Sequence, residues 1–405
     1  MRQFHKKIQN DALIIIGDLD YPSGNALSNR VHLYSKGLKE TGVFPFIINT
    51  HSSHKTKQNF GFFDRHEGIP FYYSQKTVQY EKKFFTRNLK KIKGTFHTFY
   101  IIKRLRKNNC ITVLYYSIPF FYQFIFSLFL KFYNIPIVKE CSEAPLFIIK
   151  EKKNKKLYTF ILKHIELRMY DRIIVISDFL NQYYSHFLHQ NKILQIPILV
   201  DMDRFRSSSK NCQQGKEKII TYIGSMVANK DGLNNLIEAI SYAKKHINDF
   251  KLQLVGTANE NDLQKLKDKV SFLNLTDTIN FLGLKKSSEI PEILLNSDLL
   301  VLARPDTNQS KAGFPTKLGE YLASRKPVVI TITGEIPKYL EDKKNAYLVE
   351  PDKIEDFANK IIYALKDKNA SSIGAAGYEV ANNNFNYHLF GKKLDNFLFQ
   401  SNKMT

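Results

Sequence analysis

The feature that most constrains this chain is a regular alternation of short apolar runs with amphipathic stretches along nearly all of its 405 residues. Short apolar runs suit buried strands, and the amphipathic stretches between them suit helices. Strands that alternate with helices predict βα units and parallel sheets, and they argue against a sandwich or a helix bundle. The predicted fold class is therefore α/β.

The alternation occurs in two series, which the polar segment 207–218 separates. In the first series the predicted strands are 12–16, 44–48, 111–115, 135–139, 172–175 and 193–196, and the predicted helices include 26–40 and 160–170. In the second series the predicted strands are 219–223, 252–255, 278–281, 299–302, 328–330 and 347–349, and the predicted helices are 233–246, 262–273, 289–296, 316–324 and 354–365.

Two such series predict two doubly wound, Rossmann-like domains that face a central cleft. The expected domains are 1–206 and 219–384, joined by the linker 207–218, and the last segment, 385–405, is expected to form a further helix.

Charge and cysteine content narrow the classes of partner and compartment. Sixty Lys and Arg against 38 Asp and Glu give a net charge of +22, which favours nucleic acid, acidic lipid or phosphorylated substrates. Three widely spaced cysteines suggest neither a disulfide framework nor a cysteine metal site, so a reducing cytosol is expected. The apolar runs 12–16 and 118–130 are too short for a signal peptide or a membrane span.

The segment 312–323, AGFPTKLGEYLA, predicts a helix start that faces an anion. Gly313 allows close backbone approach, and Pro315 suits the first helical position because its missing N–H would be unpaired there. The amides that follow would then point outward with the positive end of the helix dipole and seat a phosphate.

Side chains of the same segment add to this predicted seat. Thr316 and Glu320 are four residues apart and share a helix face. The Glu320 carboxylate can accept two hydrogen bonds from a vicinal diol such as ribose, although it also suits an ordinary surface helix. Lys317 is either a cation for a diphosphate or a solvated lysine of the first turn.

A second anion site is predicted where the second series begins. A strand leads to Gly224 and Ser225, and Lys230 follows just before the next helix. A glycine turn with a lysine at a helix N-terminus suits phosphate, for which Lys230 would act as a point charge.

With these residues in view, the chain resembles the glycosyltransferase family 4 enzymes of the GT-B fold, and the resemblance covers nearly the whole chain in order. It implies that 1–206 is the acceptor-side domain, that 219–384 is the donor domain and that the helix in 385–405 packs back on the first domain. Glu320 matches the last acid of the family's E-x7-E motif, and Phe314 and Pro315 stand where that motif has Phe and Gly. Lys230 matches the lysine that contacts the donor phosphates. The donor-binding residues that the resemblance implies are Gly224, Ser225, Lys230, Gly313, Phe314, Pro315, Thr316, Lys317 and Glu320.

Two positions depart from the family pattern. Ala312 stands in place of the first glutamate of E-x7-E, and Ser225 stands in place of an arginine that often follows the glycine of the phosphate loop. The chain thus lacks one carboxylate near the donor sugar and one cation near the diphosphate. These departures either reduce activity or only change which donor is bound. The sequence does not decide between these two consequences.

Acceptor-side residues are expected in the first series. The loop with Gly24 and Asn25, and Arg30 on the helix after it, resemble the glycine loop that lines the cleft in these enzymes, although a plain βα turn fits as well. Glu143, after the fourth strand, is the candidate for an acceptor-hydroxyl contact or base, or a surface carboxylate without a role. The implied catalytic residues are therefore Lys230, Glu320 and Glu143.

A basic and aromatic stretch spans residues 76–107. It holds eleven Lys or Arg against the single acid Glu81, with Phe and Tyr residues interleaved. Rings that insert among headgroups and cations that meet anionic lipid suit a membrane surface. A nucleic-acid groove has a similar composition, but we regard it as the weaker interpretation because it rests on charge alone. A solvated basic face without a specific partner is the third reading.

The resemblance implies a retaining transferase that moves a sugar from a nucleotide-sugar donor to a lipid-linked or polysaccharide acceptor in bacterial cell-surface glycan synthesis. It would work in the cytoplasm, peripherally on the inner face of the membrane, with no cofactor and no metal. The alternatives are a nucleotide-sugar epimerase of the same fold and a non-catalytic, membrane-docked binding protein whose donor site has decayed.

Overall fold

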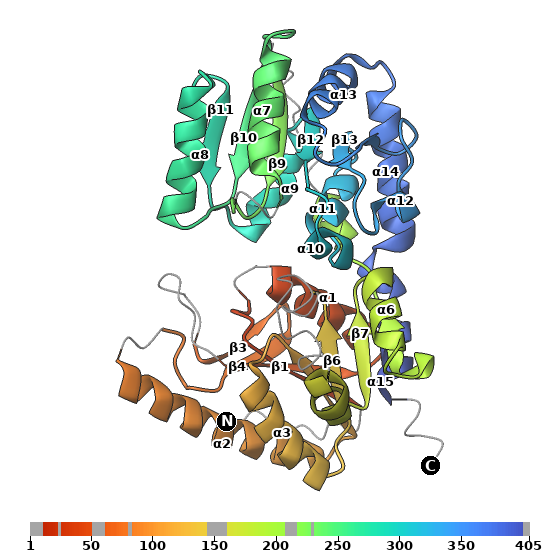
Figure 1. Cartoon of the computed structure of the whole chain (residues 1–405). Coiled ribbons are helices and arrows are strands. Elements are labelled where there is room, and N and C mark those ends of the chain that lie inside the picture. The colour runs from red at the N-terminus through yellow and green to blue at the C-terminus, as the bar shows by residue number, and fades with distance from the viewer. Residues whose placement is uncertain are drawn as a thin grey trace. The chain divides into compact units, whose positions relative to one another are not determined.

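A computed structural model of the chain describes residues 11–22, 26–50, 61–79, 83–143, 160–206, 217–227 and 231–399. The chain divides into two compact units, whose helices and strands are labelled in Figure 1. The first unit comprises Met1–Ile176, Leu180–Ile196 and Tyr387–Thr405. The second unit comprises Ser177–Phe179 and Pro197–Asn386.

The first unit is built on an eight-stranded sheet in the order β3-β4-β2-β1-β5-β6-β7-β8. Its strands are β1 (Ala12–Gly17), β2 (Phe44–Asn49), β3 (Phe63–His66), β4 (Ile69–Tyr73), β5 (Ile111–Tyr116), β6 (Ile137–Cys141), β7 (Arg172–Val175) and β8 (Ile193–Gln195). Strand β1 pairs in parallel with β2 and β5, and all six of its residues are buried. Continuous apolar runs of this kind belong to parallel strands that are covered on both faces. Among the described strands of this sheet, β3 alone runs antiparallel to its neighbour.

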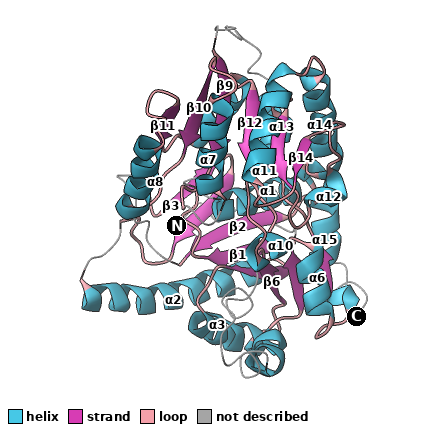
Figure 2. Ribbon diagram, turned by 45° about the horizontal axis from the view of Figure 1, so that its top comes forward, coloured by secondary structure: helices cyan, strands magenta, loops and turns pink. Residues whose placement is uncertain are grey.

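Helices of the first unit flank this sheet (Figure 2). They are α1 (Ala26–Glu40), α2 (Phe84–Arg106), α3 (Phe120–Phe132), α6 (Asp178–Ser185) and α15 (Gly391–Phe399), and α6 begins within the short stretch that clusters with the second unit. Helix α15 packs on α1 where two glycines meet, because a Cβ on Gly37 would lie 3.2 Å from the Cα of Gly391. The absence of side chains there lets the two backbones approach.

The second unit is built on a six-stranded sheet in the order β11-β10-β9-β12-β13-β14, in which every pairing is parallel. Its strands are β9 (Lys218–Ile223), β10 (Phe250–Val255), β11 (Ile279–Gly283), β12 (Leu299–Leu302), β13 (Val328–Thr331) and β14 (Tyr347–Val349). Its helices are α7 (Leu233–Lys244), α8 (Glu260–Phe272), α9 (Ile290–Leu295), α10 (Asn308–Ala312), α11 (Lys317–Ala323), α12 (Ile336–Tyr339), α13 (Ile354–Lys366) and α14 (Ala370–Asn384).

The predicted α/β class with two Rossmann-like sheets is confirmed, and most predicted strands lie within two residues of the observed ones. One helix prediction was wrong. Residues 160–170 do not form a regular α-helix, because a π-helix at Leu162–Glu166 and a 3-10 turn at Leu167–Met169 occupy most of that stretch. Periodicity did not predict β3, β4, α2, α3, α6, α10, α12 or α14.

The contact boundary between the units differs from the predicted end of the first domain at residue 206. The second unit already takes in the chain from Pro197 onward. The reason is local packing: Val200 donates its amide to the Phe385 carbonyl at 2.8 Å, and a Cβ on Gly319 would lie 3.2 Å from the Val200 side chain. Among the described helices, none is long and apolar enough to cross a membrane.

Candidate functional site

The turn after β9 brings the backbone of the second unit close to a lysine. Gly224 donates its amide to the Val255 carbonyl at 2.8 Å. A Cβ on Gly224 would lie 2.0 Å from Cε and 2.1 Å from Nζ of Lys317, so any other residue here would displace that lysine. Ser225, the next residue, is exposed. A side chain at position 224 would therefore move the Lys317 ammonium from its place in the site.

The segment Gly313–Thr316 leads into α11, which begins at Lys317 rather than at Thr316 as predicted. Phe314 is only 5% exposed, and its ring stacks on Tyr339 at 5.5 Å and meets Phe385 edge-on at 5.5 Å. We predicted Phe314 as a donor-binding residue, but its ring belongs to an apolar cluster. The buried ring instead anchors the loop that presents the start of α11.

Lys317 is not the solvated first-turn lysine that the sequence left possible. Its Nζ forms an ion pair with Asp231 Oδ2, and it lies 5.2 Å from the ring centroid of Tyr222. The Tyr222 hydroxyl lies 2.9 Å from the same Asp231 oxygen and 2.8 Å from the Ser225 carbonyl. Strand β9, the start of α7 and helix α11 thus meet at one carboxylate.

Arg304 completes this group, which we call the Asp231 cluster: Asp231, Lys317, Arg304 and Tyr222. The Nε of Arg304 lies 3.8 Å from Asp231 Oδ1, and both side chains are about 95% buried. Among the residues that the structure describes, Arg304 Nε and Nη1 have no hydrogen-bond partner. Buried polar groups of this kind are nearly always satisfied. The cluster has two cations for one carboxylate, so it favours a further anion.

Burial and charge act in opposite directions on these groups. Burial alone raises the pKa of Asp231, but the nearby Lys317 and Arg304 outweigh it and lower that pKa below its ordinary value. Burial lowers the pKa of Arg304, which Asp231 partly offsets, and raises that of Tyr222 well above its ordinary range. At neutral pH the carboxylate is charged and the phenol is protonated.

Glu320 lies one turn along α11 and is held by an arginine that the sequence did not single out. Arg204 Nη1 donates to Glu320 Oε1 at 2.6 Å, and Arg204 Nη2 donates to the Ser287 carbonyl at 2.5 Å. Within the described part of the chain, no hydrogen bond reaches the second carboxylate oxygen of Glu320. The Glu320 side chain is 20% exposed. It is therefore oriented by Arg204 while one oxygen stays available to a ligand.

Several predicted residues fall elsewhere. Lys230, Gly24 and Asn25 lie outside the described residues. Arg30 lies in the interior of the first unit, where it donates to Glu140 Oε1 at 2.9 Å and to the Ile196 carbonyl at 2.8 Å. Only 2% of its side chain is exposed, so it is a core ion pair and not a surface residue for an acceptor. Glu143 is exposed just beyond β6.

Within the second unit the structure brings together Gly224, Lys317 and the loop after Gly313, and it adds Asp231, Arg304 and Arg204 to them. Asp231 and Arg304 had a signal in the sequence that we did not use. Each follows the carboxyl side of a parallel strand, β9 or β12, where ligands of such sheets bind. Arg204 had none, because its pairing with Glu320 spans 116 residues.

One group in the first unit has the composition of a metal site. His32, His66 and Glu67 place candidate ligand atoms within 4.8 Å of one another. Burial lowers the pKa of His32 to about 4, and its Nδ1 lies 2.9 Å from the Tyr21 hydroxyl. Lys36 Nζ lies 3.2 Å from Glu67 Oε2 and already balances that carboxylate. The absence of a metal cofactor stays a prediction.

Comparison with known proteins bears on the site in the second unit. Residues 203–380 match the family model of glycosyl transferases, group 1. The matched range contains Arg204, Asp231, Arg304, Lys317 and Glu320. The Asp231 cluster and the Arg204–Glu320 pair thus lie in the part of the chain that matches this family model, which is less than half of the chain.

Two curated relatives and one solved structure illustrate the likeness. Mannosylfructose-phosphate synthase of Agrobacterium fabrum is 29% identical over 182 residues, which are 42% of this chain and 39% of that enzyme. Poly(ribitol-phosphate) alpha-N-acetylglucosaminyltransferase of Staphylococcus aureus is 28% identical over 194 residues, 47% of this chain and 37% of that protein. Anabaena HepE, solved with UDP and glucose, has a TM-score of 0.70 at 13% identity and covers 98% of this chain and 100% of its own.

These comparisons show the fold, and the family match lies within the second unit. The alignments span less than half the length of the two curated relatives. The structural likeness extends over nearly the whole chain, and the fold is GT-B, as the sequence predicted.

Proposed function

We propose that this chain is a retaining family 4 glycosyltransferase that moves a sugar from a nucleotide-sugar donor to a lipid-linked or polysaccharide acceptor of the bacterial cell surface. The observation that carries the proposal is the arrangement of α11, which presents Lys317 of the Asp231 cluster and, one turn on, Glu320. The group 1 match at residues 203–380 supports transferase chemistry. HepE, which was solved with UDP and glucose, supports a nucleotide sugar as donor.

In this proposal each donor group meets a suitable partner. The Oε2 atom of Glu320 accepts hydrogen bonds from the ribose hydroxyls. Lys317 and Arg304, together with the predicted Lys230, stabilise the negative charge that develops on the departing diphosphate. Arg304 supplies a buried cation in a site whose loop has Ser225 in place of arginine. Gly313, Pro315 and Thr316 position the start of α11, and Glu143 of the first unit is kept as the acceptor-side candidate.

Replacing Glu320 tests the donor part of the proposal. We expect Glu320→Gln to weaken nucleotide binding about tenfold or more, because a hydrogen bond to a charged group contributes roughly 1.5–3 kcal/mol. Binding is measured by the rise in melting temperature with UDP, GDP, ADP and CMP and with the corresponding nucleotide sugars, since a ligand of the folded state stabilises it by mass action. Glu355→Gln, an exposed acid in the first turn of α13, is the matched control.

The outcomes separate this function from its alternatives. No thermal shift with any nucleotide in the unchanged chain would contradict the proposal and favour a non-catalytic protein with a decayed donor site. Where a donor binds, product analysis decides the reaction: a new glycosidic bond with retained anomeric configuration supports the transferase, and a free epimerised nucleotide sugar supports an epimerase.

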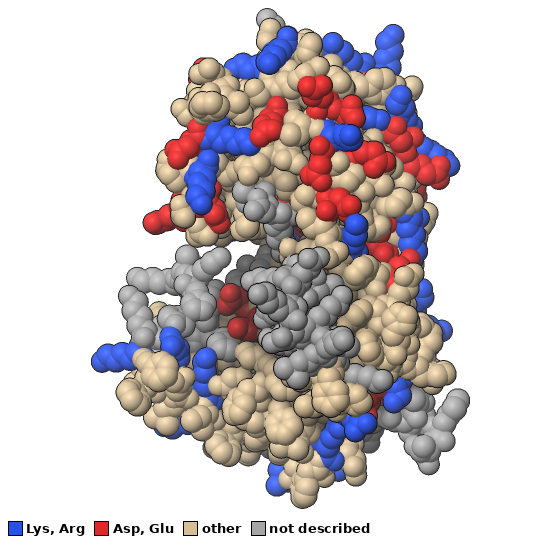
Figure 3. Space-filling view, viewed as in Figure 1, with Lys and Arg blue, Asp and Glu red and all other residues tan. Residues whose placement is uncertain are grey.

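A surface of the first unit supports attachment to an anionic membrane. Helix α2 has seven Lys or Arg and no acid, and its Phe99 stacks on Phe129 of α3 at 4.1 Å. The two helices also expose large rings, namely Phe85 at 86%, Phe96 at 66%, Phe121 at 67% and Phe132 at 80%. On the face shown in Figure 3, Lys and Arg lie among uncharged side chains over α2 and α3, whereas acidic side chains gather over the second unit. We propose a cytoplasmic protein that sits peripherally on the inner face of the membrane.

Vesicle binding tests this surface. We expect the double change Phe85→Ser and Phe96→Ser to lower binding to phosphatidylglycerol vesicles about tenfold or more, because burying one such ring is worth roughly 1.5–3 kcal/mol. Co-sedimentation measures the fraction of protein bound to the vesicles. The control Phe272→Ser, which replaces a ring 85% exposed in the second unit, should leave that fraction unchanged. Equal loss with Phe272→Ser, or tight binding to duplex DNA that competes with the vesicles, would contradict the membrane assignment.

A further inference from the structure

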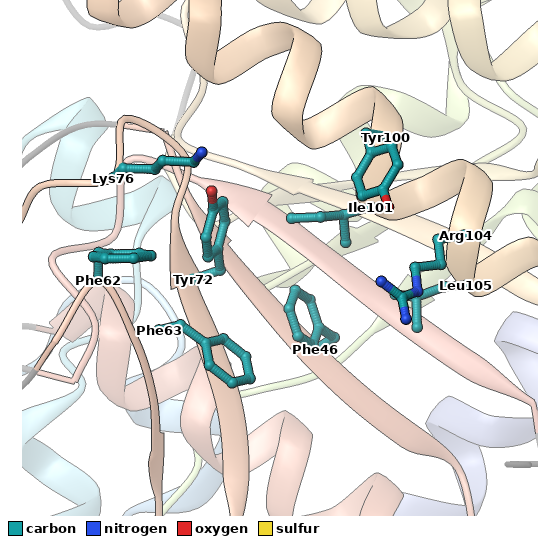
Figure 4. A pocket seen from close by; sticks show the side chains of 9 residues that line it. All are labelled: Phe46, Phe62, Phe63, Tyr72, Lys76, Tyr100, Ile101, Arg104 and Leu105. Carbon is teal, nitrogen blue, oxygen red and sulfur yellow. The ribbon is translucent and has the colours of Figure 1, made fainter. Parts of the chain in front are cut away.

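A cavity of about 420 Å³ lies within the first unit, between α2 and the strands β2, β3 and β4. Pockets that enclose small ligands typically measure about 300–1,000 Å³. Figure 4 shows the side chains that line it, which are Phe46, Phe62, Phe63, Tyr72, Lys76, Tyr100, Ile101, Arg104 and Leu105. The cavity lies in the sheet region that the predicted donor and acceptor residues do not use.

The walls of this cavity are almost entirely hydrocarbon. Strands β2 and β3 contribute Phe46 and Phe63, and α2 contributes Ile101 and Leu105 from successive turns. The Tyr72 ring belongs to the wall too, and Phe62 meets it edge-on at 6.2 Å. Such a lining has few groups that could recognise a sugar or a nucleobase, which need several hydrogen bonds. It suits a hydrocarbon chain, and at this volume one chain fills the space better than two.

One end of the cavity is polar. Tyr72 is 3% exposed, and within the described part of the chain its hydroxyl has no hydrogen-bond partner. In Figure 4 this hydroxyl points toward the same end of the cavity as the Lys76 ammonium. A buried hydroxyl without a partner is costly, so its retention is best explained by an acceptor atom that arrives with a ligand. A phosphate oxygen accepts from both a hydroxyl and an ammonium.

The charge of the surroundings agrees with an anionic head. Arg104 lies on the cavity wall, and α2, which contributes four of the lining residues, has no acidic side chain. Burial raises the pKa of Tyr72, so its hydroxyl stays protonated and able to donate at neutral pH. A neutral alcohol would use the hydrophobic walls but would offer no negative charge to the Lys76 ammonium.

We propose that this cavity binds the hydrocarbon chain of a single-chain isoprenoid phosphate, with the Tyr72 hydroxyl and the Lys76 ammonium contacting its phosphate. The inference deepens the proposed function and rests on it in one respect, because such a lipid would be the carrier of the acceptor. A single-chain lipid phosphate fits this site better than a two-chain membrane phospholipid, because the cavity holds one chain.

Farnesyl phosphate, used below the concentration at which it forms micelles, is the probe for this site. We expect it to bind the full-length protein in isothermal titration calorimetry, with farnesol binding at least tenfold more weakly and inorganic phosphate not detectably. Tyr72→Phe and Lys76→Gln should each weaken farnesyl phosphate about tenfold. Because Tyr72→Phe removes only an unpartnered hydroxyl, its melting temperature should not fall. Ile101→Trp, which fills the cavity, should abolish binding.

Unchanged affinity in both Tyr72→Phe and Lys76→Gln would overturn the proposal. Tighter binding of lysophosphatidic acid would also overturn it, because it would assign the cavity to a single acyl chain rather than to an isoprenoid. Loss of binding in Ile101→Trp supports the site only together with weaker binding in Tyr72→Phe, because the second variant removes a single hydroxyl and keeps the fold. Nucleotide thermal shifts on the same samples separate the two ideas. A nucleotide shift without farnesyl phosphate binding rejects this site alone, and farnesyl phosphate binding without any nucleotide shift rejects the proposed transferase alone.

Discussion

Glu140→Gln is expected to destabilise the first unit by about 3–5 kcal/mol, the usual result of removing one partner from a buried ion pair. Glu140 is fully buried on β6, and its carboxylate accepts from Arg30 Nε at 2.9 Å, from the Tyr34 hydroxyl at 2.9 Å and from the Ser142 hydroxyl at 2.7 Å. The neutral amide would leave the Arg30 guanidinium charged and buried with no counter-ion. The loss is large because the interior cannot solvate that charge.

Hydrogen–deuterium exchange measures this loss in the unit concerned. Amides of β1, β5 and β6 should exchange about a hundredfold faster or more, while those of β9 and β12 in the second unit keep their rates. Glu40→Gln is the matched control, because Glu40 accepts from His388 at 2.8 Å on the exposed side of α1 and such pairs are worth about 1 kcal/mol or less. The paired change Arg30→Met with Glu140→Leu should restore much of the protection. Equal effects of Glu140→Gln and Glu40→Gln would contradict this account.

Asp231→Asn should destabilise the second unit in the same way and lower its free energy of unfolding by about 3 kcal/mol. The change leaves Lys317 and Arg304 beside each other without the carboxylate that separates them. Lys317 can turn toward solvent because its side chain is 20% exposed, but Arg304 is 5% exposed and cannot. Urea unfolding followed by exchange at β9, β12 and β13 measures the loss. We expect Asp231→Asn combined with Arg304→Met to be more stable than Asp231→Asn alone.

The pH dependence gives the same residue a second test. The pKa of Asp231 is lower in the folded chain than its ordinary 3.8, so the unfolded chain binds the proton more tightly. The stabilisation from Asp231 is therefore fully present above pH 3.8 and is lost as the pH falls through its folded pKa. The stability gap between the unchanged chain and Asp231→Asn should be constant from about pH 5 to 8 and narrow only in acid. A gap that grows in acid would contradict the ion-pair explanation.

Alternating apolar runs were enough to predict both sheets, because parallel strands buried on two faces must be apolar along their whole length. They did not predict α2, because charged and aromatic residues interrupt any single apolar face of this helix. They also did not predict β3 and β4, which are short and lie at one end of the sheet. The irregular turns at 162–169 were wrongly predicted as an α-helix, because their sequence has ordinary helical periodicity.

Residue types in the site were easier to predict than their partners. The sequence singled out Glu320, Lys317 and Gly224 through spacing and helix-start chemistry, and these residues lie in the second unit beside buried charges. It assigned Phe314 to the donor, whereas the fold uses that ring to hold the loop. It assigned Arg30 to an acceptor, whereas the fold buries it against Glu140, 110 residues away.

The sequence by itself therefore determined the fold class, the division into two βα series and the chemistry that the start of α11 can offer, because these depend on neighbours within a few residues. Only the tertiary structure decided which charges are paired and which are left over. Lys317 meets Asp231 across 86 residues and Arg204 meets Glu320 across 116, and no local pattern encodes either distance. The same holds for the cavity behind α2, because a helix and three strands must pack before the Tyr72 hydroxyl is enclosed.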